Sequence, residues 1–152
     1  MTIKAYKPNM QPDIVAFYAE CFQALGWDYD PQGEHADTVH IAEEYLETGQ
    51  FWCLYDCGAL VGTVALRAIG RGEQIAELKR LYVLPAWQGK GLGGLLFDTA
   101  FQYAKRSGFK TIYADTRNDR LASRHLLCSY GFHEITQYND NAFAELFYAL
   151  DL

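Results

Sequence analysis

A glycine-rich segment gives the clearest sign of chemistry in this chain, because four glycines fall within six residues: Gly89, Gly91, Gly93 and Gly94. They lie where a strand pattern ends and a helical pattern begins, so backbone N–H groups are exposed with no side chains in front of them. These donors and the positive end of the helix dipole favour an anion. The segment, which also carries the cation of Lys90, therefore predicts a site for a phosphate-bearing ligand.

The elements that must hold this segment form one α/β domain over residues 1–152. Apolar and alternating runs predict strands at residues 2–7, 51–57, 60–69, 75–84, 111–114, 132–138 and 143–150, with turns at Gly58 and at residues 70–73. Helical spacing predicts four helices, the second capped by Asp37, that end at Gly26, Gly49, Gly108 and Gly131. The order β-α-α-β-β-β-α-β-α-β-β predicts a mixed sheet with helices on both faces.

Composition limits the classes of binding partner and the cellular compartment that we expect for this protein. A net charge of −6 and an isoelectric point near 5.1 argue against nucleic acid and anionic membrane as partners, because both require a basic face. The first residues lack an apolar core of signal-peptide length, and no run of about 18 apolar residues occurs, so we expect a cytoplasmic protein. No metal site is expected, since His35 and His40 do not share a helix face. The cysteines lack metal spacing and are expected to be core thiols: Cys21, Cys53, Cys57 and Cys128.

Two general phosphate-binding motifs compete for the glycine segment. The Walker loop needs a serine or threonine after its lysine, whereas Gly91 follows Lys90. The dinucleotide fingerprint G-x-G-x-x-G is formally present at residues 89–94, and Asp115 lies 21 residues beyond it, where a ribose-binding acid belongs. However, residues 85–88 separate the glycines from the strand, and only 37 residues follow Asp115. A dinucleotide-binding domain is therefore the weaker alternative.

The sequence Gln-Gly-Lys-Gly-Leu-Gly at residues 88–93 is similar to the Gln/Arg-x-x-Gly-x-Gly/Ala loop of the GNAT superfamily of acyl-CoA-dependent N-acetyltransferases. As in that family, the loop follows a strand that ends in Leu-Tyr-Val-x-Pro, and Tyr-Gly-Phe at residues 130–132 resembles the second CoA-side motif. The order of elements is similar over the whole chain, and residues 138–141 resemble the tail of a subgroup with no assigned substrate. The resemblance predicts acetyl transfer from acetyl-CoA, the co-substrate, to a primary amine of a small molecule or peptide.

This resemblance also implies where acetyl-CoA would bind. The sheet should be centrally splayed, with the strand of residues 75–84 parting from the strand of residues 111–114. Main-chain groups of Leu81, Tyr82 and Val83 would then pair with the pantetheine arm as an added strand does. The pyrophosphate would rest on the backbone of the loop, formed by Gln88, Gly89, Lys90, Gly91, Leu92, Gly93 and Gly94.

Candidate catalytic residues follow from the same resemblance, with one departure. An amine must lose a proton to attack a thioester, and Glu77 is the first candidate for the base, with Asp115 as the second. For Glu77, an ion pair with a neighbouring cation is an equal alternative. Relatives place an acid tyrosine four residues before Gly131, where this chain has Leu127. Either Tyr130 substitutes for that tyrosine, or the thiolate leaves unassisted.

Acceptor specificity is expected from the loops at residues 27–34 and 138–143, which are acidic and aromatic and would suit a cationic amine. Relatives place a ligand-binding asparagine where this chain has Arg120. The missing tyrosine also leaves a non-enzymatic alternative, a CoA-responsive binding module. The last two strands offer an edge for a homodimer, which the sequence alone does not test.

Overall fold

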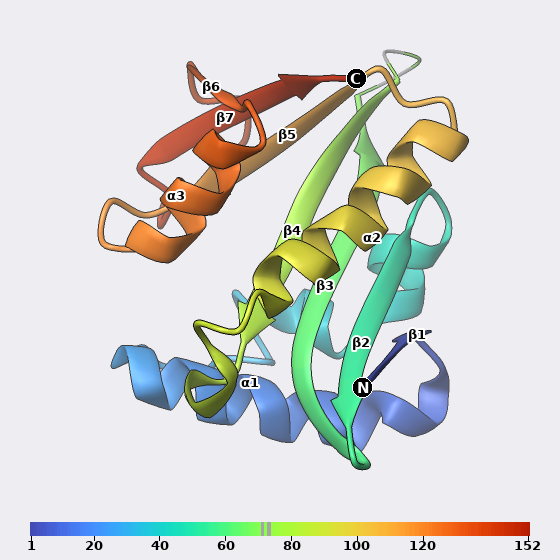
Figure 1. Ribbon diagram of the computed structural model, residues 1–152, viewed down its shortest axis with the longest axis vertical. Coiled ribbons are helices and arrows are strands. Elements are labelled where there is room, and N and C mark those ends of the chain that lie inside the picture. The colour runs from blue at the N-terminus through green and yellow to red at the C-terminus, as the bar shows by residue number, and fades with distance from the viewer. Residues whose placement is uncertain (71, 73) are drawn as a thin grey trace.

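The fold is arranged around one long strand, β4. The computed structural model describes residues 1–70, 72 and 74–152, and its sheet has the order β1-β2-β3-β4-β5-β7-β6 (Figure 1). Its strands are β1 (Thr2–Ala5), β2 (Gln50–Asp56), β3 (Ala59–Ile69), β4 (Ile75–Val83), β5 (Thr111–Thr116), β6 (His133–Ile135) and β7 (Leu146–Asp151). Neighbours are antiparallel except β4 and β5, which pair in parallel as predicted. The turn predicted at residues 70–73 includes residues 71 and 73, which lie outside the described residues.

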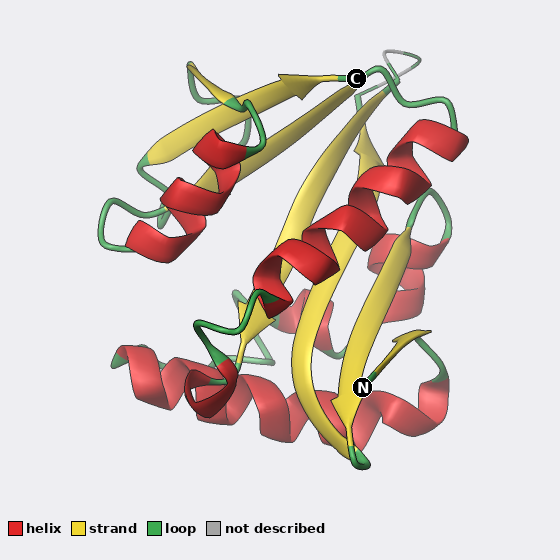
Figure 2. Cartoon of the chain, viewed as in Figure 1, coloured by secondary structure: helices red, strands yellow, loops and turns green. Residues whose placement is uncertain are grey.

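Helices cover both faces of this sheet, which confirms the predicted α/β class. α2 (Leu92–Arg106) and α3 (Leu121–Ser129) lie on one face, and α1 (Gln11–Leu25) crosses the other (Figures 1 and 2). α1 ends at Gly26, whose φ of 74° is the left-handed conformation typical of a helix C-terminus. Both long helices bury residues at helical spacing, although Leu25 and Leu95, which the sequence pattern places on these faces, are exposed. The buried residues are Ile14, Tyr18, Cys21 and Phe22 in α1, and Leu92, Leu96, Phe97, Ala100 and Ala104 in α2.

The predicted second helix is not a regular α-helix. Short 3₁₀ helices occur at Pro8–Met10, Ala36–Thr38 and Pro85–Trp87, and Ala42–Leu46 forms a π-helical turn. Asp37 does not cap a helix, because its carboxylate accepts hydrogen bonds from the side chains of Arg80 and Tyr45 instead. Gly49, the predicted end of this helix, lies directly against β3, where a Cβ atom would meet the carbonyl oxygen of Leu66 at 1.8 Å. Tertiary contacts therefore override the helical pattern in this segment.

The centre of the sheet is splayed, as the resemblance implied. β4 pairs with β5 only over Ile75–Leu78 and Thr111–Ala114, and the two strands then diverge. Figure 1 shows β5 and β7 turning away from β3 and β4 below this short pairing. Among the described residues, no strand thus lies beside the edge of β4 beyond Leu78 on the β5 side.

A bulge lies in β4 where this divergence begins. The pairing with β3 shifts register between Thr63 and Ala65, and Arg80 has a φ of 55°, a left-handed conformation that is uncommon for a residue with a side chain. The Thr63 hydroxyl donates to the Arg80 carbonyl at 2.8 Å and lies 2.8 Å from the hydroxyl of buried Tyr18. These buried hydrogen bonds hold the bulge in place.

The end of the chain differs from its prediction. β6 and β7 are shorter than the strands predicted at residues 132–138 and 143–150, and β7 lies between β5 and β6. The intervening residues leave the sheet because side chains of Tyr138 and Asn139 reach back to β4.

The cysteine prediction is correct for two residues and wrong for two. Cys21 and Cys53 are buried, and burial raises the pKa of each thiol to about 12, so neither is a reactive thiolate near neutral pH. Cys57 and Cys128 are exposed, because they lie in the β2–β3 turn and on the outer side of α3. Among the residues that the structure describes, no helix has the length and apolarity that a membrane crossing requires.

Candidate functional site

The glycine segment forms an open loop ahead of α2. Gly89 and Gly91 have φ values of 76° and 78°, and a Cβ atom built on either would find no atom within 4 Å. Gly93 and Gly94 lie under α3 and the residue that follows it: added Cβ atoms would be 3.7 Å from Leu126 and 3.6 Å from the Tyr130 hydroxyl, which is ordinary van der Waals contact. Of these four glycines, only Gly89 and Gly91 therefore face open space that a ligand could occupy.

Hydrogen-bond donors lie close together at this loop. The N–H groups in the first turn of a helix lack intrahelical partners, and Leu92, Gly93 and Gly94 occupy that turn of α2. The Nζ atom of Lys90 lies 5.0 Å from the centre of the Trp87 ring and adds a positive charge. These groups could hold the phosphates of a ligand.

Gln88 has a role inside the loop that the sequence did not indicate. Its side-chain amide donates to the carbonyl oxygen of Val83 at 2.9 Å, and its backbone N–H donates to Pro85 at 3.3 Å. Both groups are therefore engaged within the protein, as is the Val83 carbonyl. The unpaired edge of β4 that faces the splay includes Leu81 and Tyr82.

A large cleft, which we call the central cleft, opens where β4 and β5 part. Its volume is about 1030 Å³. β4, β5, the segment of residues 27–37, α3 and the loop between β6 and β7 contribute to its walls. Three of the candidate cofactor-binding and catalytic residues line it, namely Leu81, Tyr82 and Asp115, and Leu127 does so too. Glu77 and Tyr130 are not among the described residues that line it.

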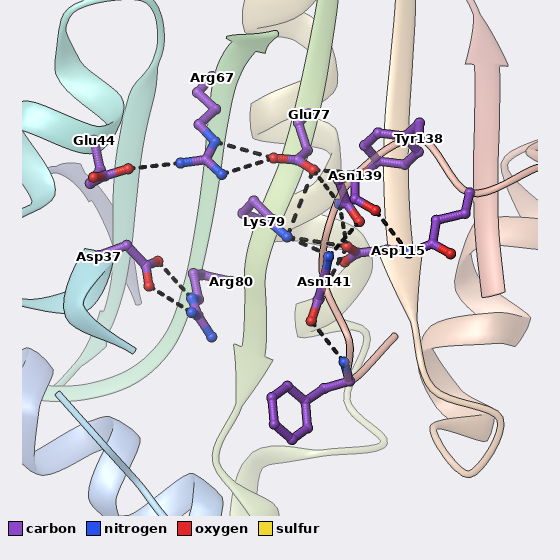
Figure 3. A network of polar contacts seen from close by, with 12 residues as sticks. Asp37, Glu44, Arg67, Glu77, Lys79, Arg80, Asp115, Tyr138, Asn139 and Asn141 are labelled. Atoms are coloured by element: carbon purple, nitrogen blue, oxygen red, sulfur yellow. Dashed lines mark hydrogen bonds and ion pairs between the residues drawn. The ribbon is translucent and has the colours of Figure 1, made fainter. Parts of the chain in front are cut away.

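Glu77 is buried at the centre of a polar network (Figure 3), with 2% of its surface exposed. Its Oε1 atom accepts hydrogen bonds from Arg67, whose Nε and Nη2 atoms both lie 3.1 Å away. Its Oε2 atom accepts from the Tyr138 hydroxyl at 2.8 Å and from Asn139 at 3.0 Å, and Lys79 lies 3.7 Å from it. Both carboxylate oxygens are therefore occupied by the protein itself.

Tyr138 is a permanent donor to this network. Burial, followed by the charges of Glu77 and Asp115, raises the pKa of the Tyr138 hydroxyl far above its ordinary value. The hydroxyl therefore stays protonated and keeps its hydrogen bond to Glu77.

Asp115 lies beside Glu77 but faces the central cleft (Figure 3). Its Oδ2 atom accepts from Asn139 at 2.7 Å and from Asn141 at 3.2 Å, and Lys79 lies 3.3 Å away. Its Oδ1 atom has one contact, to Lys79 at 3.4 Å. Asp115 therefore has an oxygen with capacity to accept a proton or a hydrogen bond from a ligand.

A second ion pair holds the wall of the cleft opposite this network. The guanidinium of Arg80 donates to both oxygens of Asp37, at 2.6 and 2.8 Å. Burial lowers the pKa of Arg80, but its hydrogen bonds and charge interaction with Asp37 outweigh this effect, so the pKa lies well above its ordinary value. The pKa of the Asp37 carboxyl is lowered in turn, because Arg80 and Tyr45 more than offset the effect of burial. Both groups are charged at neutral pH.

The structure separates Tyr130 from the two carboxylates. The Tyr130 ring packs against Phe97 at 4.0 Å between centres, and its hydroxyl donates to Asp98 at 3.2 Å on the α2 side. Burial, followed by the charge of Asp98, raises the pKa of this hydroxyl. Leu127 does face the central cleft, at the position where relatives place their tyrosine.

The aromatic loop at residues 27–34 is packed against α1. The Trp27 and Tyr29 rings lie 6.0 and 5.5 Å from the ring of Phe22, and Tyr29 bonds the Thr38 hydroxyl. The Nδ1 atom of His35 accepts the backbone N–H of Asp30, and burial, together with the charge of Arg80, lowers the His35 pKa. A neutral His35 therefore carries its proton on Nε2 and is a donor toward the cleft.

Four residues of the polar network and the adjoining ion pair were not predicted as site residues: Asp37, Glu44, Arg67 and Arg80. They lie in separate segments, and no local spacing marks them as partners. Tyr138, Asn139 and Asn141 lie in the loop at residues 138–143 that was expected to contact the acceptor, but their hydrogen bonds to Glu77 and Asp115 were not predicted.

Comparisons with known proteins agree with this geometry. The sequence model of the Acetyltransferase (GNAT) family matches residues 12–132. An uncharacterised N-acetyltransferase of Schizosaccharomyces pombe is 34% identical over 151 residues, which cover 97% of this chain and 92% of that protein. An acetyltransferase of the GNAT family from Staphylococcus aureus Mu50 has a similar fold, with a TM-score of 0.89, 20% identity, and coverage of 99% of this chain and 98% of that one. An acetyltransferase from Streptococcus agalactiae 2603 has a TM-score of 0.86 at 25% identity, with the same coverage.

Proposed function

This protein belongs to the GNAT family of acetyltransferases, and we propose that it transfers the acetyl group of acetyl-CoA to a primary amine of a small molecule or peptide in the central cleft. The observation that carries the proposal is the continuity of three features along β4. The open glycine loop, the unpaired strand edge and the central cleft follow one another along the splay. These three features match, in order, the pyrophosphate, the amide-rich arm and the reactive end of one extended ligand.

The residues present fit acetyl-CoA, which would supply the acetyl group as a thioester. The backbone of residues 89–94 and the charge of Lys90 would hold the pyrophosphate. Main-chain groups of Leu81 and Tyr82 would pair with the pantetheine arm, as in strand addition. Gln88 and the Val83 carbonyl would support the loop through their mutual hydrogen bond.

We assign the role of base to Asp115 and a positioning role to Glu77. Asp115 faces the cleft and has an oxygen with one long contact, whereas both oxygens of Glu77 are occupied and its side chain is buried. A base must reach the proton that it removes, and Asp115 meets this geometric requirement. Glu77 holds Arg67, Lys79 and Asn139 in place around it.

In the reaction, the amine nitrogen forms a bond to the acetyl carbon and the carbon–sulfur bond breaks. The amine loses its proton to Asp115, and the sulfur gains one from solvent, since Leu127 cannot donate. Backbone N–H groups at residues 81–83 would stabilise the developing oxyanion. A thiolate is a good leaving group because its basicity is modest, so a side-chain acid is not essential.

Two measurements test the proposal. Acetyl-CoA at about 100 times its dissociation constant should stabilise the protein by roughly 2.7 kcal/mol, whereas NAD and ATP should not. Free CoA should then be released in the presence of primary amines. Absence of stabilisation by acetyl-CoA would refute the cofactor assignment.

A non-catalytic CoA-binding module remains a second candidate because Leu127 replaces the expected acid. It would show the same stabilisation by acetyl-CoA but no release of CoA with any amine. Turnover therefore separates the two functions.

A further inference from the structure

The cations of the central cleft differ in how they are neutralised. Arg67 pairs with Glu44 and Glu77, at 2.9 and 3.1 Å. Lys79 lies 3.3 Å from Asp115, and Arg80 is held by both oxygens of Asp37. The charge of each of these three cations is balanced by carboxylates of the protein.

Arg120 lines the same cleft without such a partner. Its guanidinium lies 4.9 Å from the Tyr82 ring centre and 5.6 Å from the Trp27 ring centre. Among residues 1–70, 72 and 74–152, its side chain has no ion pair and no hydrogen bond. Guanidinium donors that are half-buried and stacked on aromatic rings, with no acceptor in the protein, remain available to a ligand.

Arg117 adds a second guanidinium group beside Arg120. Its guanidinium lies 4.9 Å from the Trp27 ring centre, so two arginines approach the same indole. Its only carboxylate contact within the described chain is to exposed Asp119, two residues away, at 3.3 Å. Exposed pairs of this kind contribute little energy, so Arg117 can exchange this contact for a ligand.

The loop that carries both arginines is fixed in position. Asn118 donates to Glu145 through its backbone N–H and through its side-chain amide, each at 3.1 Å. Arg124 donates to the Asn118 carbonyl at 3.0 Å. The two guanidinium groups are thus presented by an anchored loop, which reduces the entropy cost of binding a ligand.

We propose that Arg120, with Arg117 beside it, binds a carboxylate of the acceptor, so that the substrate is an amino acid or another small amine that also carries a carboxylate. The inference rests on the proposed acetyltransferase function. It replaces the sequence-based expectation of a purely cationic amine. The amine of such a zwitterion would lie near Asp115, and its carboxylate would lie near Arg120.

Charge favours a carboxylate over a phosphate at this position. The arginine forks match either group. However, five exposed carboxylates also line the cleft and would repel a dianion more strongly than a monoanion: Asp28, Asp30, Glu34, Glu44 and Asp140. A singly charged carboxylate is therefore the better match for one unpaired guanidinium.

The experiment compares kcat/KM for L-amino acids with kcat/KM for their carboxamides, which keep the amine and lose the negative charge. We expect at least about 10-fold preference for the acid, which is the usual effect of a charged hydrogen bond. Arg120→Gln should remove this preference, and Arg120→Lys should retain part of it. The preference is a ratio of two kcat/KM values for one variant, so any change in acetyl-CoA binding that follows from the contact of Arg120 with Tyr82 cancels. Arg106→Gln, at an exposed position in the last turn of α2, is the matched control and should keep the preference.

Rates measured with other acceptors can contradict the inference. Equal rates with acids and carboxamides would overturn it, and so would a higher kcat/KM for spermidine than for any amino acid. A preference for phosphoethanolamine over the carboxylate acceptors would assign the arginines to phosphate instead. In each of these cases CoA is still released, so the acetyltransferase function would stand. No release of CoA with any amine would refute the function, and the inference with it.

Discussion

The region where β4 and β5 part has two halves, a paired half and an open half, and they hold carboxylates in opposite states. Where β4 pairs with β5, Glu77 has a partner for each carboxylate oxygen and is almost completely buried. Beyond the splay, Asp115 has an oxygen with one long contact, and the glycine loop faces open space. Groups whose hydrogen-bonding capacity is filled inside the protein stabilise the fold, whereas groups with spare capacity can act on ligands. Substitutions in each half test this distinction.

The largest effect on activity is expected from Asp115→Asn. The amide keeps the shape of the side chain and cannot accept the amine proton, so kcat should fall about 100- to 10,000-fold, the range for a lost general base. Release of CoA under saturating substrates measures this loss, and thermal denaturation monitors folding. A kcat within about 10-fold of the unmodified protein would show that Asp115 is not the base.

Glu77→Ala should act on stability rather than on chemistry. It leaves Arg67 with only its exposed partner Glu44 and Lys79 with only Asp115, which should lower the free energy of unfolding by about 3 kcal/mol, the lower end of the range for a broken buried ion pair. Urea denaturation measures the loss, and Glu134→Ala, at an exposed position on β6, is the control that should show none. If Glu77→Gln abolished turnover while stability stayed unchanged, the roles of the two carboxylates would be reversed.

Tyr138→Phe should lower the free energy of unfolding by less than Glu77→Ala does. The hydroxyl donates to the carboxylate of Glu77, and a hydrogen bond to a charged group contributes about 1.5–3 kcal/mol. Tyr113→Phe is a matched control, because its ring packs against Tyr138 at 4.8 Å while its hydroxyl donates to no side chain among the described residues. Equal melting temperatures for the two variants would contradict the stabilising role of the network.

The smallest change is expected for two glycines at opposite ends of α2. Gly91 and Gly108 both have left-handed φ values, 78° and 84°, and both have open space where a Cβ atom would project. Substitution of either by alanine should cost about 1–2 kcal/mol of backbone strain. Only Gly91→Ala should raise KM for acetyl-CoA, because its methyl group would enter the glycine loop. A similar rise for Gly108→Ala would mean that strain alone affects binding.

The sequence allowed the glycine loop and the order of elements to be predicted because both depend on neighbouring residues. The loop is contiguous, and strand and helix periods are local. The network around Glu77 could not be predicted, since Asn139 is 62 residues from Glu77 and approaches it only after β7 has inserted beside β5. Aspartate often caps helices, which is why Asp37 was predicted to be a cap. Its hydrogen bond with Arg80 depends on the bulge in β4. Local patterns thus predict the open glycine loop, whereas the contacts of Glu77 and Asp37 depend on the folded structure.

The insertion of β7 between β5 and β6 has a consequence for protein synthesis. β5 emerges from the ribosome before the strand that covers its outer edge, because residues 146–151 are translated after residues 111–116. Until then, Glu77 and Asp115 lack the Tyr138, Asn139 and Asn141 side chains that bind them. A nascent chain can already contain the whole glycine loop and still lack the completed centre. The order of translation thus delays the network around Glu77 and Asp115 until after the glycine loop has been made.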